Sequence, residues 1–253
     1  GAPETLPAED SLVLLSIAAQ LALSGNRGDI RLAYEVVALV LELLETPQAL
    51  ALGAADVILA RLGNFPARSL TRSRFTQTGE SMITGGAALA LESIARESEN
   101  AVEIRQREVV LTDFQRRLFD ALDRWNSVSI SAPTSAGKSF LLSLDVIRHH
   151  VRRKKGAIVF VVPTRALIRQ VMRDVIERLR EFGTPEVTVL CVPEAASSEL
   201  LENGLVYVLT QERLINLIAT HGADLPISLL IIDEAQELGD AGRGIILQSA
   251  IER

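Results

Sequence analysis

The segment 131–139 carries the residue types that bind nucleotide phosphates. It reads Ser-Ala-Pro-Thr-Ser-Ala-Gly-Lys-Ser, follows the β-like run Ser127–Ile130 and precedes the helical run Phe140–Val151. In such a strand–loop–helix context backbone N–H groups point at the phosphates, a lysine reaches the β and γ oxygens, and a hydroxyl holds Mg²⁺. We therefore expect Lys138 to bind phosphate and Ser139 to hold Mg²⁺. The other expected phosphate-binding residues of the loop are Thr134, Ser135, Ala136 and Gly137.

A second group of candidate residues, Asp233 and Glu234, lies about a hundred residues further along the chain. The carboxylates follow the aliphatic run Leu229–Ile232, which is typical of a buried parallel strand. Open α/β sheets bind ligands at the carboxyl ends of their strands. We expect Asp233 to hold Mg²⁺ and Glu234 to polarise the attacking water, so the two groups together predict an ATP-hydrolysing enzyme.

Together these residues resemble the superfamily 2 helicases, the group that contains the DEAD-box and DEAH-box enzymes. Ala132–Ser139 is similar to motif I of that family, and Asp233–Gln236 is similar to motif II. Pro163–Leu167 resembles motif Ia and Thr210–Leu214 resembles motif Ib, and the resemblance covers residues 112–253. It implies a RecA-like domain that binds ATP and Mg²⁺.

Motifs Ia and Ib are where the family binds a nucleic-acid strand. Pro163 ends a predicted strand, and Thr164 can cap the helix behind it, whose first turn exposes N–H groups to a phosphate. Thr210 repeats this arrangement, and Arg213 follows it within the motif. The arginines at 165, 169 and 173 share one helix face, which is most often a solvated face. Arg165 is the exception, because it stands at the helix start beside the expected strand-binding edge.

Gln115 is the candidate residue for recognising the base. It stands where the family has its adenine-reading glutamine, and an amide can bond both N6–H and N7 of adenine. The alternative is a polar residue on the amphipathic helix Asp113–Trp125 with no role in binding.

Charge divides the chain into two parts. Residues 1–104 hold 7 basic and 13 acidic side chains, a net charge of −6, whereas residues 105–253 hold 19 of each. The net negative charge of the N-terminal part argues against a nucleic-acid-binding surface there. We predict a small all-helical domain over 1–104, able to dock a protein partner, followed by an α/β RecA-like P-loop domain with a mostly parallel sheet over 105–253.

The predicted elements follow the hydrophobic pattern. Helices are expected over Leu12–Leu21, Ile30–Leu44, Ala49–Leu62 and Ser81–Glu97, with Phe65–Gly79 as a connection. Strands are expected over Val128–Ser131, Ala157–Val162, Val187–Val192, Leu205–Leu209 and Leu229–Asp233. No apolar run has the length of a membrane span and no secretory signal opens the chain, so we expect a cytoplasmic protein without a membrane partner.

Two functions from different classes remain open. The first is the N-terminal part of an ATP-dependent helicase or translocase that acts on single-stranded or tailed nucleic acid. DNA is favoured over RNA, because the stretch Asp240–Gly244 resembles the branch that includes the archaeal repair helicases. The second is a nucleotide-dependent switch module that does not translocate. The family has two RecA-like domains, and the sequence ends before any motif III, so we expect a fragment whose second RecA-like domain lies elsewhere in the full-length chain.

Overall fold

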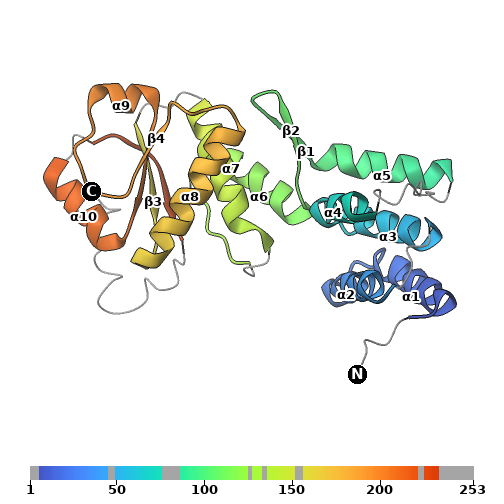
Figure 1. Cartoon of the computed structure of the whole chain (residues 1–253). Helices are drawn as coiled ribbons and strands as arrows, with labels where there is room; N and C mark the ends of the chain where they lie inside the picture. Colours follow the sequence, from blue (N-terminus) through green and yellow to red (C-terminus); the bar gives the residue numbers. More distant parts are fainter. Residues whose placement is uncertain are drawn as a thin grey trace. The chain divides into compact units, whose positions relative to one another are not determined.

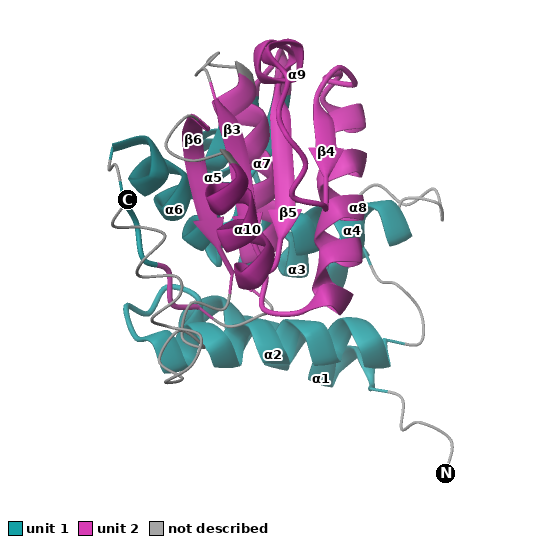
Figure 2. Ribbon diagram, turned by 90° about the vertical axis from the view of Figure 1, so that its left-hand side faces the viewer, with its two compact units in different colours: residues 1–103, 108–129 teal, residues 104–107, 130–253 magenta. Residues whose placement is uncertain are grey.

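The computed structural model describes residues 6–44, 49–75, 86–124, 127–132, 136–151, 156–221 and 225–233. The chain forms two compact units (Figures 1 and 2). Unit 1 comprises residues 1–103 and 108–129, and unit 2 comprises residues 104–107 and 130–253. Helix α6 therefore packs with the N-terminal unit, although the sequence analysis assigned it to the second domain.

Unit 1 is built mainly from helices. In chain order they are α1 (Ala8–Leu21), α2 (Arg27–Leu43), α3 (Ala49–Arg61), α4 (Phe65–Phe75), α5 (Ala87–Asn100) and α6 (Asp113–Arg124). The core forms where α1, α2 and α3 meet, and it contains the fully buried Leu15, Val37, Val40 and Ile58. This packing agrees with the helical pattern predicted for these three segments.

None of the helices in the described ranges is long and apolar enough to cross a membrane.

Helix α4 corrects the prediction that Phe65–Gly79 is a connection. The segment has no continuous apolar stripe, because its buried residues are Phe65, Arg68 and Thr71. Arg68 and Arg72 each donate two hydrogen bonds to the carboxylate of Asp56, which is 1 % exposed, at 2.7 to 3.0 Å. An ion-pair network around the buried Asp56 thus replaces part of the hydrophobic face by which an amphipathic helix is recognised in a sequence.

A two-stranded sheet, which the sequence analysis missed, connects α5 to α6. Its strands are β1 (Ala101–Ile104) and β2 (Arg107–Val110), joined by Arg105 and Gln106. Both turn residues have positive φ, 50° and 65°, as a type I′ turn requires. The missing signal is an Asn-Gly or Asp-Gly pair, the usual sequence marker of this turn.

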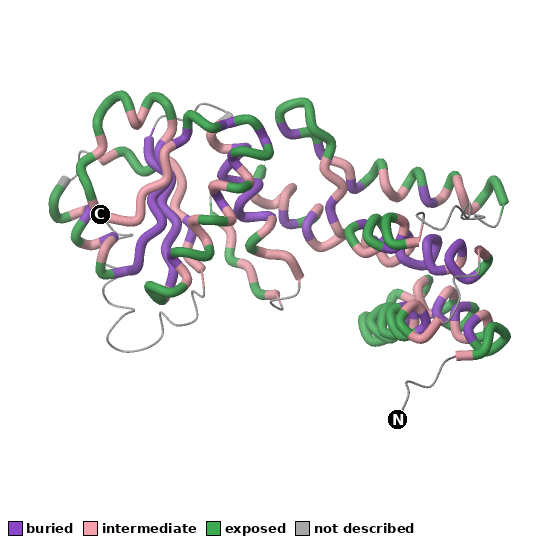
Figure 3. Tube along the Cα trace, viewed as in Figure 1, coloured by how far each residue is buried: buried purple, intermediate pink, exposed green. Residues whose placement is uncertain are grey.

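Unit 2 is an α/β unit around a four-stranded sheet with the order β4-β5-β3-β6. Its strands are β3 (Ala157–Val161), β4 (Thr188–Leu190), β5 (Leu205–Leu209) and β6 (Ile227–Ile232). Its helices are α7 (Lys138–Val151), α8 (Arg165–Glu181), α9 (Ser198–Asn203) and α10 (Gln211–His221). All three strand pairs are parallel, and every residue of β3 and β5 is buried (Figure 3). The predicted fold class, a parallel α/β domain preceded by helices, is confirmed.

The prediction of a strand over Val128–Ser131 is wrong in this structure. The segment is assigned to no strand, and the described part of β6 pairs only with β3. A strand needs a neighbour to accept and donate its backbone hydrogen bonds. The sequence pattern identifies an extended run with β propensity, but it does not show whether a neighbouring strand is available to pair with it.

Candidate functional site

The described part of the phosphate-loop segment has features that the loop requires. Gly137 has a φ of +74°, a left-handed conformation that favours glycine, immediately before the first residue of α7. The Lys138 Nζ donates a hydrogen bond of 2.7 Å to the carbonyl of Ala132, so the lysine side chain turns back over the loop. Ser139 is exposed in the first turn of α7. Thr134 and Ser135 lie outside the described residues.

Three parallel strands end at one edge of the sheet, and candidate residues follow each of them. The Asp233 N–H donates to the carbonyl of Val161 at 2.9 Å, and the Val162 N–H donates to the carbonyl of Leu209 at 2.9 Å. Asp233 therefore comes directly after β6, at the level where β3 ends. This is the carboxyl edge at which parallel sheets bind ligands. Glu234 lies outside the described residues.

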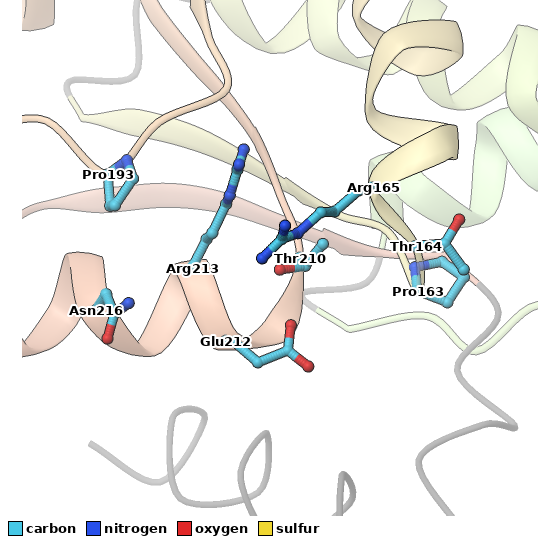
Figure 4. Close-up of a pocket in the computed structure, with 8 residues that line it drawn as sticks. All are labelled: Pro163, Thr164, Arg165, Pro193, Thr210, Glu212, Arg213 and Asn216. Atoms are coloured by element: carbon cyan, nitrogen blue, oxygen red, sulfur yellow. The ribbon is translucent and has the colours of Figure 1, made fainter.

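A pocket of about 710 Å³ lies beyond the ends of β3 and β5 (Figure 4). It contains all five residues that the sequence analysis predicted to contact nucleic acid: Pro163, Thr164, Arg165, Thr210 and Arg213. Three further residues line it, namely Pro193, Glu212 and Asn216. The structure thus brings together two motifs that are separated by about 45 residues in the sequence.

Helix starts provide the pocket with backbone N–H groups. Thr164 is the N-cap of α8, and its Oγ1 accepts a hydrogen bond from the Leu167 N–H at 3.4 Å, as the sequence predicted. Helix α10 begins at Gln211, directly after the buried Thr210. The first turn of a helix has N–H groups without an intrahelical acceptor and a partial positive charge, and both favour an anion.

The two arginines of the pocket are held differently. The Arg213 guanidinium donates to the carbonyl of Cys191, so its side chain is tied to the loop behind β4. The exposed side chain of Arg165 makes no hydrogen bond or ion pair with any residue in the described part of the chain. Arg165 can therefore bind an anion without first breaking a polar contact to the described residues.

The sequence analysis missed Pro193 and Asn216 as lining residues and did not assign a role to Glu212. Glu212 and Asn216 stand one turn apart on α10, so a four-residue spacing from the motif could have indicated Asn216. Pro193 had no such signal, because only the packing of the segment after β4 brings it to this edge.

Gln115 has a structural role at the start of α6. Its Oε1 accepts a hydrogen bond of 3.0 Å from the Thr112 N–H, and the Thr112 Oγ1 accepts one of 3.2 Å from the Gln115 N–H. This reciprocal pair is a capping box, in which two otherwise unpaired N–H groups of the first turn are satisfied. Recognition of adenine by Gln115 stays a prediction.

Comparison with known proteins identifies similar sequences. A family model described as "DEAD/DEAH box helicase" matches residues 112–253. A probable helicase HelY of Mycobacterium tuberculosis is 31% identical over 145 residues, which are 56% of this chain and 15% of that protein.

Two further relatives have names that specify a nucleic acid. The ATP-dependent DNA helicase Hel308 of Thermoplasma acidophilum is 26% identical over 140 residues, covering 55% of this chain and 20% of that protein. The exosome RNA helicase MTR4 of Homo sapiens is 27% identical over 144 residues, covering 56% of this chain and 13% of that protein. The chain thus spans a fifth or less of the length of these relatives. No solved structure matches the chain significantly.

Proposed function

Because the chain belongs to the DEAD/DEAH box helicase family, we propose that it is the ATP-binding and strand-gripping part of a nucleic-acid helicase or translocase. The observation that carries the proposal is the pocket at the carboxyl edge of the sheet. Residues expected to grip the strand come from two separate motifs and line one space. A switch module that binds no nucleic-acid strand would not require a pocket lined by residues of both motifs.

Nucleotide binding is assigned to the phosphate loop. Gly137 has the backbone conformation that such a loop needs, and Lys138 stands where α7 begins. In the proposal Lys138 and the loop N–H groups bind the phosphates, Ser139 and Asp233 hold Mg²⁺, and Glu234 orients the attacking water. A bound Mg²⁺ ion neutralises charge on the phosphates.

Strand binding is assigned to the pocket. Its helix starts and its two arginines supply donors and positive charge for phosphate oxygens, which are the groups that fix a protein on a nucleic acid without reading sequence. Glu212 opposes an anion at one side, so the phosphates are expected nearer to Arg165 and Arg213. Among nucleic acids the proposal favours single-stranded or tailed DNA over RNA, on the resemblance to the repair-helicase branch.

Helicase activity requires more than the phosphate loop and one strand-binding pocket. We propose that a second RecA-like domain in the longer protein supplies the arginine finger and the other half of the strand track. An arginine finger is typically worth about 10³ to 10⁵ in rate. Residues 1–253 alone should therefore bind ATP weakly and hydrolyse it negligibly.

The experiment is a fluorescence titration of residues 1–253 with a labelled ATP analogue and Mg²⁺. Lys138→Ala should weaken binding at least about tenfold, because a hydrogen bond to a charged group contributes about 1.5–3 kcal/mol. Lys154→Ala removes the same residue type outside the motif and serves as the control. Equal effects of the two substitutions would refute the assignment of Lys138.

A further inference from the structure

Helix α5 has the reverse of the polarity that is usual for a helix on a protein surface. Its buried residues, Ser93 and Asn100, are polar. The two largest side chains on its outer side, Leu91 and Ile94, are 67 % and 59 % exposed (Figure 3). The exposed residues of α5 are Ala87, Ala88, Leu91, Ile94, Ala95, Ser98 and Glu99. An outward apolar face of this kind indicates a surface that another molecule covers.

Ion pairs fasten the inner side of α5 to its own unit. Glu92 pairs with Arg61 of α3, and Glu97 pairs with Arg68 of α4, both at 2.7 Å. These contacts turn the charged groups of the helix toward unit 1. The outer face is therefore uncharged from the start of α5 up to Glu99 in the last turn.

The exposed apolar surface of the protein is concentrated in unit 1. Of the twelve large hydrophobic side chains that are exposed in the described ranges, eleven belong to this unit, whereas unit 2 exposes Ile227. On α2 such side chains alternate with charges, because Leu32 stands beside the exposed ion pair of Arg31 and Glu35. The uncharged face of α5 is thus the part of this surface that loses least by being removed from water.

The two ends of α5 have opposite electrostatic needs. The helix begins after Gly86 without a side-chain cap and without an acidic residue in its first turn. Glu99 in the last turn pairs with Arg96 of the same helix at 3.2 Å and keeps 66 % of its side chain exposed. A carboxylate is favourable at the start of a helix and unfavourable at its end. An antiparallel copy of α5 satisfies both ends, because each Glu99 then lies against the first turn of the other helix.

The order of large and small residues along the face fits the same arrangement. Two antiparallel copies of α5 related by a two-fold axis at position 93 bring Leu91 of one against Ala95 of the other, and Ala88 against Ser98. A large side chain therefore meets a small one at the centre of the contact, as in knobs-into-holes packing. In a parallel pair Leu91 would meet Leu91 and Glu99 would meet Glu99, so like charges would repel.

We propose that α5 is a self-association surface on which a second copy of the chain docks antiparallel, with Leu91 and Ile94 at its centre. Each copy presents the same face, as a two-fold contact requires. With 14 residues α5 is about 21 Å long. A contact along it lies at the small end of specific interfaces, so we expect a weak dimer rather than an obligate one. The proposal requires neither ATP nor a nucleic-acid strand, and its failure would leave the proposed function untouched.

The test is sedimentation equilibrium of residues 1–253 over a wide range of protein concentrations, without nucleotide or nucleic acid. The wild type should show a reversible equilibrium between monomer and dimer. Leu91→Gln should weaken dimerisation about a hundredfold, because burial of one leucine contributes about tenfold and the dimer loses two. Leu23→Gln is the matched control, since Leu23 is also 67 % exposed but lies in the turn after α1, and it should change nothing.

Paired substitutions test the antiparallel register. Leu91→Ala and Ala95→Leu should each weaken dimerisation, the first by loss of contact and the second by overpacking against Leu91. The double variant exchanges the large and small positions at constant total volume, so it should dimerise more strongly than either single variant. Glu99→Gln should weaken dimerisation about fivefold, whereas Glu103→Gln removes the same charge from β1 and should not weaken it. All substituted side chains are exposed, so circular dichroism should show unchanged helical content.

Three results would overturn the inference. A wild type that stays monomeric at every concentration would mean that a second copy does not cover the face, and that a different protein is its occupant. Unchanged dimerisation of Leu91→Gln, or an equal loss in Leu23→Gln, would show that α5 is not the contact. A double variant that dimerises more weakly than both single variants would refute the antiparallel register.

Discussion

Arg165→Ala tests the assignment of the pocket to a nucleic-acid strand. The side chain is exposed, lines the pocket and makes no ion pair or hydrogen bond within the described ranges. Its removal therefore breaks no hydrogen bond or ion pair to the described residues, unlike removal of Arg213, which is bonded to the Cys191 carbonyl. The whole effect should be the loss of one contact to a phosphate.

The magnitude follows from counterion release. Each phosphate contact on a single strand contributes about 0.7 to the slope of log K against log salt concentration. At 50 mM monovalent salt one lost contact corresponds to about an eightfold loss of affinity, and at 200 mM to about a threefold loss. The slope itself should become shallower by about 0.7.

The assay is fluorescence anisotropy of a labelled oligo(dT) and a labelled oligo(U), titrated with residues 1–253 at several salt concentrations. Arg173→Ala is the matched control, because this exposed arginine lies on α8 two turns beyond Arg165. Equal losses for the two variants would mean that only the general charge of α8 matters. An unchanged slope for Arg165→Ala would refute phosphate binding by this residue.

Three other substitutions test the remaining reasoning. Asp56→Asn should lower the free energy of unfolding by about 3–5 kcal/mol, as for removal of one partner from a buried ion pair, and Glu35→Ala in an exposed pair should have little effect in the same urea titration. Burial opposes the shift, but hydrogen bonds from two arginines hold the pKa of Asp56 below its usual value. The stability that Asp56 contributes is thus present above its unfolded-state pKa and lost as the pH falls through its folded-state pKa, which acid titration of the wild type and Asp56→Asn will show. Gly63→Ala should lower the free energy of unfolding by more than about 1 kcal/mol, because Gly63 has a positive φ. Gly25→Ala should have a smaller effect, because there is open space around Gly25. In the longer enzyme Glu234→Gln should still bind ATP and Mg²⁺ but lose hydrolysis, and wild-type phosphate release would contradict its assigned role.

The sequence by itself determined the elements in which local chemistry is decisive. The aliphatic runs of β3 and β5 predict buried strands, which the structure confirms, and Thr164 caps the following helix as predicted. The aliphatic run of β6 also forms a strand, but only Ile231 of it is buried. The phosphate-loop motif needs residue types at fixed spacing, so Lys138 and Ser139 could be predicted as phosphate and Mg²⁺ ligands without coordinates, and these roles stay predictions. These features depend on near neighbours in the chain, which a sequence displays directly.

Only the tertiary structure decided the features that depend on partners distant in the sequence. Helix α4 has no apolar pattern that would predict it. Its arginines Arg68 and Arg72 pair with Asp56, which lies on α3. Val128–Ser131 has a strand-like sequence but no pairing strand in the described residues. The attachment of α6 to the N-terminal helices depends on Asp113 meeting Asn100 and the backbone of Gly63. A hydrogen bond or ion pair satisfies a polar group equally well from any distance along the chain, so no local pattern reveals where its partner lies.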